Sequence, residues 1–214
     1  MTTDSRAPLR GLYFITPAVP ESADPRATHL ARAAAALRGG ASLIQFRDKQ
    51  LAGDAREAIA RELVALAHTH GARCIINDDT KLAARTQADG VHLGRDDPDP
   101  TAARALLGPN AIIGVSCYNE LARAEAAARA GASYVAFGTM FASPTKPEAA
   151  FAGPELIRQA RAALDLPICG IGGITPDNAG EVVAAGADLV AVIQGISAAP
   201  DPEAAARRIS TLFD

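Results

Sequence analysis

Eight short apolar segments recur along this chain, and alanine-rich segments separate them. The apolar segments are rich in β-branched residues and read GLYFIT, SLIQF, RCIIN, DGVHL, AIIGVS, SYVAFG, PICGIG and DLVAVI. Runs of this length are typical of buried strands, and their alternation with helical segments predicts parallel strands joined by right-handed crossovers. Eight such units in 214 residues favour a single-domain α/β fold, a closed (β/α)₈ TIM barrel, over an open doubly wound sheet.

Proline and glycine mark the predicted helix boundaries. The predicted helices span residues 26–38, 54–70, 80–86, 100–107, 119–130, 154–164, 176–185 and 202–213. The first helical turn tolerates proline, and such prolines are Pro25, Pro100, Pro154, Pro176 and Pro202. Thr175 and Asp201 precede two of them and can cap the helices that follow. We expect a polar N-terminal segment over residues 1–10 and the barrel domain over residues 11–214.

Charge and composition exclude several classes of partner. The net charge is −3, and aromatic residues make up 4% of the chain, which disfavours binding to nucleic acid or to an anionic membrane surface. The N-terminal sequence MTTDSRAPLR lacks the apolar core of a signal peptide, and no apolar run reaches the roughly 18 residues of a membrane span. These features predict a cytoplasmic protein.

Three cysteines lie far apart in the sequence and form no CxxC pair. We expect Cys74, Cys117 and Cys169 to be buried and reduced. Cys117 follows a predicted strand closely and stays a weak candidate for a nucleophile.

The four histidines give little indication of a catalytic role. His29, His68 and His70 lie in predicted helices and are expected at the surface. His92 ends a predicted strand, where a hydrogen-bonded structural role is favoured over a catalytic one.

Polar residues gather after the predicted strands, at the end of a barrel where active sites are built. They include Gln45, Arg47, Lys49, Asn77, Asp78, Asp79, His92, Asp96, Asp97, Ser116, Ser143, Thr145, Lys146, Gly172, Gly173, Gln194 and Gly195. Arg47, Lys49 and Lys146 could neutralise a strongly anionic group such as pyrophosphate. Asp78 and Asp97 are oxygen ligands suited to Mg²⁺, although NDD by itself is more often a turn.

Two glycine-containing loops and one long loop complete this end of the barrel. GIGGIT and VIQGIS follow the seventh and eighth strands, where barrel enzymes often hold a phosphate, while a plain tight turn is the alternative. The longest connection, MFASPTKPEAAFAG, is a candidate lid.

Seven motifs stand in an order and spacing that resemble the thiamine phosphate synthase family. They are IQFRDK, INDD, DGVHLGRDD, GVSCYN, ASPTKP, IGGIT and AVIQGIS, and the similarity runs from GLYFITP to PEAAARRI. The resemblance implies a transferase of thiamine biosynthesis with two small-molecule substrates. It would join 4-amino-5-hydroxymethyl-2-methylpyrimidine diphosphate to 4-methyl-5-(2-phosphooxyethyl)thiazole, giving thiamine monophosphate and pyrophosphate. Pyrophosphate would leave first, and the thiazole nitrogen would capture the resulting cation.

The resemblance also implies a role for each matching residue. The pyrimidine diphosphate would contact Gln45, Phe46, Arg47, Asp48, Lys49, Asn77, Ser116 and Lys146. Of these, the residues expected to carry catalysis are Arg47, Lys49, Ser116 and Lys146. Asp78 and Asp97 would bind Mg²⁺. The thiazole phosphate would contact Ser143, Pro144, Thr145, Gly173, Ile193 and Gln194.

Two rival functions use the same kind of barrel. A thiazole tautomerase-like isomerase would share the phosphate loops but would not need a diphosphate pocket with two metal carboxylates. A non-catalytic thiamine phosphate binder would keep the pocket without turnover. The alanine-rich helix faces could also support a homodimer, but the sequence does not indicate which face would pair.

Overall fold

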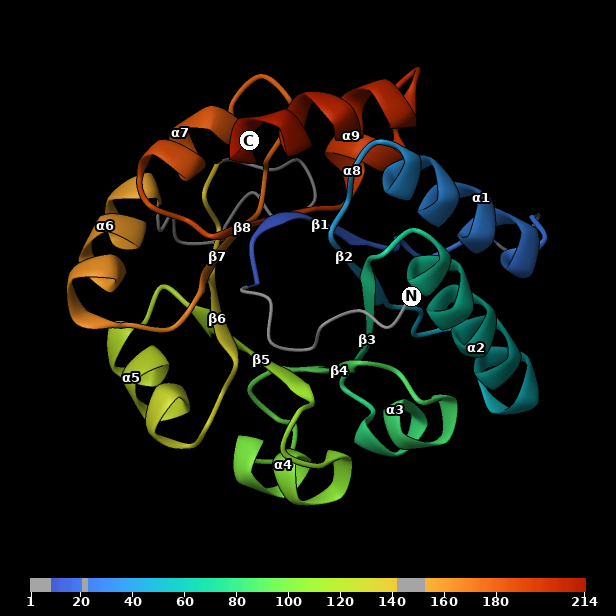
Figure 1. The fold of residues 1–214 in the computed structure, drawn as a ribbon, viewed down its shortest axis with the longest axis horizontal. Coiled ribbons are helices and arrows are strands. Elements are labelled where there is room, and N and C mark those ends of the chain that lie inside the picture. Colours follow the sequence, from blue (N-terminus) through green and yellow to red (C-terminus); the bar gives the residue numbers. More distant parts are fainter. Residues whose placement is uncertain (1–8, 21–22, 142–152) are drawn as a thin grey trace.

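The computed structural model describes residues 9–20, 23–141 and 153–214, and these form a closed barrel of eight parallel strands inside a ring of helices (Figure 1). The strands are β1 (Gly11–Ile15), β2 (Leu43–Phe46), β3 (Arg73–Asn77), β4 (Gly90–Leu93), β5 (Ile112–Tyr118), β6 (Tyr134–Phe137), β7 (Ile168–Ile171) and β8 (Leu189–Val192). Each strand pairs in parallel with the next, and β8 closes the barrel on β1. The predicted fold is therefore confirmed.

The helices follow the strands in sequence and cover the outside of the barrel (Figure 1). They are α1 (Pro25–Arg38), α2 (Gly53–Thr69), α3 (Thr80–Thr86), α4 (Pro100–Leu107), α5 (Leu121–Arg129), α6 (Gly153–Ala163), α7 (Ala179–Ala184), α8 (Gln194–Ser197), α9 (Pro202–Ser210) and the 3₁₀ helix η1 (Thr211–Phe213). Of the polar segment predicted over residues 1–10, only residues 9 and 10 are described.

Two helix predictions need correction. The helix predicted from residue 176 begins at Ala179, because the side chain of Asn178 accepts the Thr175 backbone N–H at 2.8 Å and holds the preceding residues in a turn. Thr175 therefore does not cap α7, whereas Asp201 caps α9 as predicted. The four-residue helix α8 was not predicted, since it is too short to show a helical pattern.

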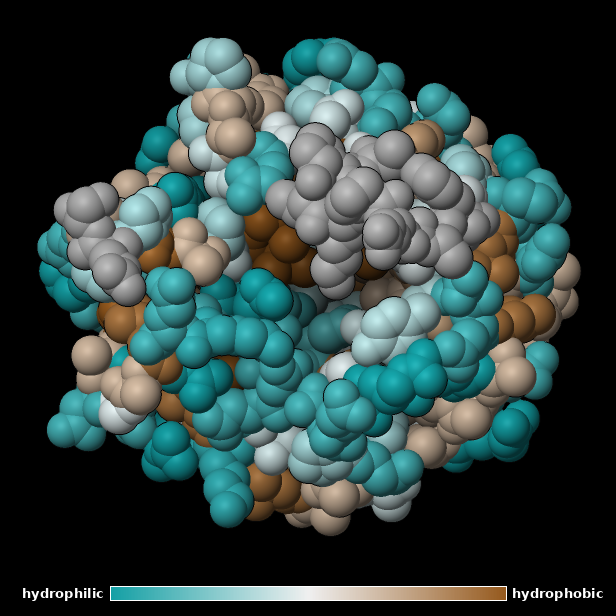
Figure 2. Space-filling view, turned by 180° about the vertical axis from the view of Figure 1, so that it is seen from behind, coloured by the Kyte–Doolittle hydropathy of each residue, from teal (hydrophilic) through white to brown (hydrophobic). Residues whose placement is uncertain are grey.

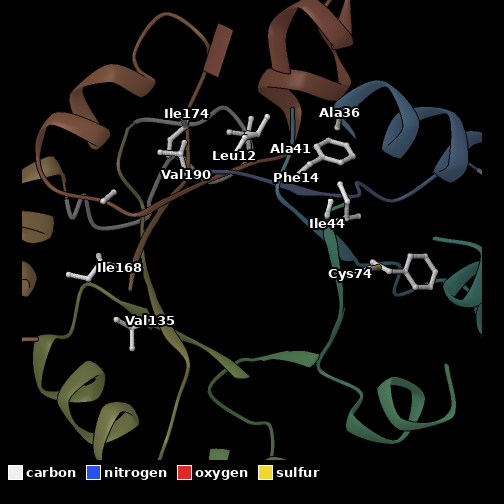
Figure 3. Close-up of a cluster of buried hydrophobic side chains, with 14 of the residues drawn as sticks. Leu12, Phe14, Ala36, Ala41, Ile44, Cys74, Val135, Ile168, Ile174 and Val190 are labelled. Atoms are coloured by element: carbon white, nitrogen blue, oxygen red, sulfur yellow. The ribbon is translucent and has the colours of Figure 1, made fainter. Parts of the chain in front are cut away.

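Side chains from the strands alternate between two packed layers. The outer layer lies between barrel and helices; Figure 3 shows Phe14, Ile44 and Val190 among the strand side chains in it. The inner layer fills the barrel and comprises Tyr13, Ile15, Leu43, Ile75, Ile112, Tyr134, Ala136, Cys169, Leu189 and Ala191. The barrel interior is thus a packed core that supports the site above it, as in other barrels.

Figure 2 shows the molecule from the side opposite to Figure 1. This face has a hollow near its middle, with hydrophilic residues to the left of it and below it and apolar residues along its upper side. Within the described ranges, none of the helices has the length and apolar character needed to cross a membrane.

Candidate active site

The loop that follows β2 carries the predicted anion-binding residues, and β1 fixes its backbone. Thr16, directly after β1, is buried. Its hydroxyl accepts the backbone N–H of Arg47 at 2.9 Å and donates to the Arg47 carbonyl at 3.2 Å. Arg47 is therefore held at the junction of two strands, although the strand itself ends at Phe46.

Asp48 holds the same loop from the inside. One carboxylate oxygen lies 2.8 Å from His29 Nε2, and the other accepts the backbone N–H groups of Gln50 and Leu51 at 2.8 and 3.0 Å. Burial raises the pKa of Asp48, but these hydrogen bonds outweigh burial and the net pKa is lowered. The expectation that His29 lies at the surface was wrong: its side chain is fully buried against Asp48 and Phe46.

Two carboxylates and one cation meet at the ends of β2, β3 and β4. Lys49 Nζ lies 3.5 Å from Asp78 Oδ2. Asp97 accepts the Gly94 backbone N–H at 2.6 Å, and its pKa is raised by burial first and then by the neighbouring Asp78. Asp78 has a φ of 64°, a left-handed conformation that is uncommon outside glycine and often found at functional sites.

This carboxylate pair has the chemistry of a site for a hard divalent cation. Asp78 and Asp97 repel each other, and a divalent cation would relieve that repulsion. Among the described residues, no group of three or more histidine, cysteine or acidic side chains could hold a metal. A cation bound here would therefore need further oxygen ligands from substrate and water.

The third member of the NDD motif has a different role. Asp79 caps α3 by accepting the Leu82 backbone N–H at 2.8 Å, and its other oxygen lies 3.0 Å from Arg56. Asn77 is nearly buried at the last position of β3. The motif thus combines a buried amide, a carboxylate that contacts Lys49 and a helix cap.

Ser116 on β5 is held by the histidine of β4. Its hydroxyl lies 2.8 Å from His92 Nε2, and His92 Nδ1 lies 2.7 Å from the Tyr134 hydroxyl. Burial lowers the pKa of His92 to about 4, against the opposing charge of Asp97. His92 is therefore neutral near pH 7, and both of its ring nitrogens are hydrogen-bonded.

The two glycine loops lie against each other. A Cβ on Gly195 would lie 2.4 Å from the carbonyl oxygen of Ile174, so only glycine allows this approach. Gly173 has a φ of 66°, and its carbonyl accepts from the Asn178 side chain at 3.0 Å. Ile193 precedes Gln194, the first residue of α8. The backbones after β7 and β8 therefore approach each other closely at Gly195.

Four predicted site residues lie outside the described residues: Ser143, Pro144, Thr145 and Lys146. Most of the predicted lid lies outside them as well.

A family model described as thiamine monophosphate synthase matches residues 12–196. The chain belongs to this family. A thiamine-phosphate synthase of Thioalkalivibrio sulfidiphilus is 51% identical over 212 residues, which are 99% of each chain. One from an Azoarcus species is 53% identical over 206 residues, covering 96% of this chain and 98% of the relative. The solved thiamine phosphate pyrophosphorylase of Pyrococcus furiosus superposes with a TM-score of 0.83 at 32% identity, covering 95% of both chains.

The resemblance inferred from the seven motifs is thus confirmed. The function is that of a thiamine phosphate synthase, an enzyme of the transferase class that acts in thiamine biosynthesis.

The three cysteines lie in the buried core of this thiamine phosphate synthase. Cys74, Cys117 and Cys169 are buried and free, as predicted. Burial raises the pKa of Cys117 to about 12, despite the opposing effect of Arg123. A thiol with such a pKa is a poor nucleophile near neutral pH.

Two residues that shape the thiamine phosphate synthase site, Arg123 and His29, were not predicted from the sequence. Arg123 donates to the carbonyls of Ser116 and Gly94 at 2.8 and 3.0 Å, and so ties β5 to the loop that holds Asp97. For His29 a signal was present. It stands four residues before Ala33, on the stripe that α1 buries.

Proposed function

We propose that the residues at this mouth bind the pyrimidine diphosphate and assist the loss of pyrophosphate. The observation that carries the proposal is the meeting of Lys49, Asp78 and Asp97 from the ends of three neighbouring strands. A cation next to paired carboxylates suits a diphosphate bound together with a divalent cation better than it suits a single phosphate.

The proposed reaction breaks the bond between the pyrimidine methylene carbon and the diphosphate oxygen. The electron pair leaves with pyrophosphate, and the ring amine stabilises the cation that remains. The thiazole nitrogen then supplies the electron pair for the new C–N bond. Arg47 and Lys49 would stabilise the leaving charge, together with Lys146, which lies outside the described residues.

Asp78 and Asp97 would hold Mg²⁺. When bound there, the ion would supply positive charge to the leaving pyrophosphate. Asp48 would hold the loop in the conformation that places Arg47 and Lys49 next to the substrate. Its own carboxylate is already hydrogen-bonded to His29 and to backbone N–H groups.

The pyrimidine would lie over the β2, β3 and β5 ends of the mouth. Gln45, Phe46, Asn77 and Ser116 would contact or support it. Gln45 and Ser116 already take part in hydrogen bonds that start inside the barrel, which leaves their orientation well defined. A positioned substrate loses less freedom at the moment of reaction.

The thiazole phosphate would bind on the other side, over the joined glycine loops. Gly173, Ile193 and Gln194 would contact it, together with Ser143, Pro144 and Thr145 from outside the described residues. Support comes from the contact between Gly195 and Ile174, which brings two backbone segments to one place.

We also propose that the enzyme works in the cytoplasm, does not act on nucleic acid or membranes, and could form a homodimer. Membership of a family of biosynthetic enzymes supports the first statement. The acidic net charge and the few aromatic residues support the second. The alanine-rich helix faces support the third.

The test of the proposed reaction is pyrophosphate release by the purified protein. We expect release with both substrates and Mg²⁺ present, with thiamine monophosphate as co-product. Omitting the thiazole phosphate or adding a chelator should abolish the co-product. Binding of the thiazole phosphate without turnover of the diphosphate would contradict the proposal and favour an isomerase or a binder.

A further inference from the structure

Tyr118 ends β5 at the mouth of the barrel in an unusual conformation. Its φ of 55° lies in the left-handed region that residues other than glycine seldom adopt, and the residue is 40% exposed. The pairing of β5 with β6 shifts register between Ser116 and Tyr118, and a shift of this kind re-aims the side chain beside it. A strained backbone at the edge of a site points to a functional role for the side chain that it carries.

The ring of Tyr118 lies beside two arginines from different segments of the chain. The guanidinium carbon of Arg95 is 4.8 Å from the ring centroid, and that of Arg123 is 5.9 Å from it. Both distances are within the range of a cation–π contact. Arg95 also forms an ion pair with Glu120, the residue before α5. The ring therefore joins the loop after β4 to α5 at the end of β5.

Arg123 holds the same loop through its backbone. Its Nε donates to the Ser116 carbonyl within β5 at 2.8 Å, and its Nη2 donates to the Gly94 carbonyl after β4 at 3.0 Å. The Gly94 N–H is donated to Asp97 at 2.6 Å, and a Cβ on Gly94 would lie only 3.1 Å from that carboxylate. Asp97 thus rests on a backbone segment that Arg123 fixes.

Asp97 needs such support because of its neighbour. Asp78 and Asp97 carry like charges, and the proximity of Asp78 helps to raise the pKa of Asp97. Without a cation between them, this repulsion favours an arrangement in which the two carboxylates lie further apart. Asp78 is fixed by its own backbone N–H, which is donated to the His92 carbonyl at 2.8 Å. The loop that carries Asp97 is therefore the part that has to resist the repulsion.

We propose that Tyr118 and Arg123 are positioning residues, which hold residues 94–97 against the end of β5 and thereby keep Asp97 close to Asp78 for a divalent cation. The inference rests on the proposed function, because it takes the two carboxylates as ligands of Mg²⁺. Ligands that are already in place lose less freedom when the cation binds, so the positioning raises metal affinity. Both residues act through Asp97 and need no contact with the cation.

The test measures how much Mg²⁺ tightens the binding of inorganic pyrophosphate, a product of the proposed reaction. Calorimetry gives the pyrophosphate affinity with and without Mg²⁺, and the ratio of the two affinities is the metal enhancement. Tyr118→Asn removes the ring, while asparagine tolerates the left-handed φ. We expect its metal enhancement to fall by about two- to fivefold, the value of one exposed cation–π contact. Its affinity for metal-free pyrophosphate should not change.

Arg123→Met tests the second residue, and here positioning and simple electrostatics predict opposite signs. Loss of a positive charge near the site would by itself favour a bound cation and raise the metal enhancement. The positioning role predicts a fall of at least about tenfold, because two hydrogen bonds from a charged group to the backbone are lost.

Two control variants separate positioning from other effects of the substitutions. Tyr118→Phe keeps the ring and should keep the metal enhancement within about twofold of wild type. Arg129→Met removes an exposed arginine from the same helix and should not lower the metal enhancement. Affinity for the thiazole phosphate should stay within about twofold of wild type in all four variants, because its proposed contacts lie on other strands.

Each variant decides the role of the residue that it replaces. An unchanged or raised metal enhancement in Tyr118→Asn or in folded Arg123→Met would overturn that role and leave the proposed function intact. An equal fall in Tyr118→Phe would rule out the ring contact. If Arg123→Met does not fold, Arg123→Lys replaces it, because its ammonium lacks the fork that reaches both carbonyls. Wild-type protein without metal enhancement, or an unchanged enhancement in Asp78→Asn, would overturn the proposed metal site and the inference together.

Discussion

At the scale of single residues, several polar side chains of the mouth bind backbone. Thr16 holds Arg47, and Asp48 holds the residues after Lys49. Arg123 holds one carbonyl just after β4 and one within β5. Fixing backbone in this way leaves neighbouring side chains less freedom to lose when a ligand binds. The position of the charged side chains at the mouth therefore depends on Thr16, Asp48 and Arg123, which hold the backbone around them.

The first prediction concerns Asp48. Asp48→Asn should lower the free energy of unfolding by about 2 kcal/mol at pH 7, because it weakens buried hydrogen bonds to a charged group. The folded pKa lies below the ordinary value of 3.8, so this stabilisation is complete above pH 3.8 and is lost as the pH falls through the folded pKa. Urea unfolding at pH 7, 5 and 3 should show equal differences at the first two values and a smaller one at the third.

The matched control for Asp48 is Glu155→Gln, which removes an exposed carboxylate paired with Arg158. Its effect should stay within about 0.5 kcal/mol at each pH. A difference for Asp48→Asn that grows toward low pH would contradict the sign of the assigned pKa shift.

The second prediction concerns the thiol of Cys117. Because burial raises its pKa to about 12, Cys117 should react with a disulfide reagent at pH 8 only as fast as the protein unfolds. Cys117→Ala should retain at least about a third of wild-type activity, since no step uses the thiol. Rapid labelling of the folded protein, coupled to loss of activity, would restore the nucleophile hypothesis.

At the scale of elements, aspartate begins helices on the side of the barrel that carries the site. Asp24, Asp79, Asp99 and Asp201 cap α1, α3, α4 and α9 through their side chains. A cap satisfies a free N–H group at the start of a helix and sets where the helix begins. The loops before these four helices are thereby fixed where the helices begin.

The third prediction uses two adjacent carboxylates with different roles. Asp78→Asn should reduce Mg²⁺-dependent turnover by at least about 100-fold with little change in unfolding free energy, because it removes a proposed ligand of the cation. Asp79→Ala should lose about 1 kcal/mol of stability and keep most activity, because it removes the cap of α3.

Asp79→Asn is the control for this pair, since asparagine can also cap a helix. It should stay close to wild type in both measurements. Near-normal turnover of Asp78→Asn across a Mg²⁺ titration would rule out the proposed metal ligand.

At the scale of the whole molecule, closure of the barrel brings the first and last helices together. Helix α9 packs on α1, with Arg38 and Glu203 paired at 2.7 Å (Figure 1). A Cβ on Gly39 would lie 2.4 Å from Ala206 and 2.6 Å from the Glu203 carbonyl. The close contact between the end of α1 and helix α9 therefore requires glycine at position 39.

The fourth prediction tests this closure. Gly39 has a φ of −78°, which alanine adopts without strain, so Gly39→Ala should destabilise by steric conflict alone, at about 2 kcal/mol. Gly180→Ala lies in α7 with open space around the new methyl group and should stabilise by roughly 0.5 to 1 kcal/mol. Thermal melts of the two variants should shift in opposite directions, and equal shifts would contradict the packing argument.

The sequence by itself determined the order of strands and helices, the closed barrel and the family. Apolar runs and helix signals are local, and eight repeats leave few ways to bury both faces of the strands. It also placed Asp78 and Lys49 at strand ends, which meet in a parallel barrel. These inferences needed only spacing and topology.

Tertiary structure alone decided which polar groups became partners. Tyr13 and Tyr134 are 121 residues apart, and Arg38 and Glu203 are 165 apart. The sequence suggested that His29 lies at the surface, but in the folded protein it is buried next to Asp48. The helix α8 has only four residues, too few to show a helical pattern in the sequence. The physical reason is that hydrogen bonds depend on distances of a few tenths of an ångström, which are set by barrel register and packing and not by local sequence.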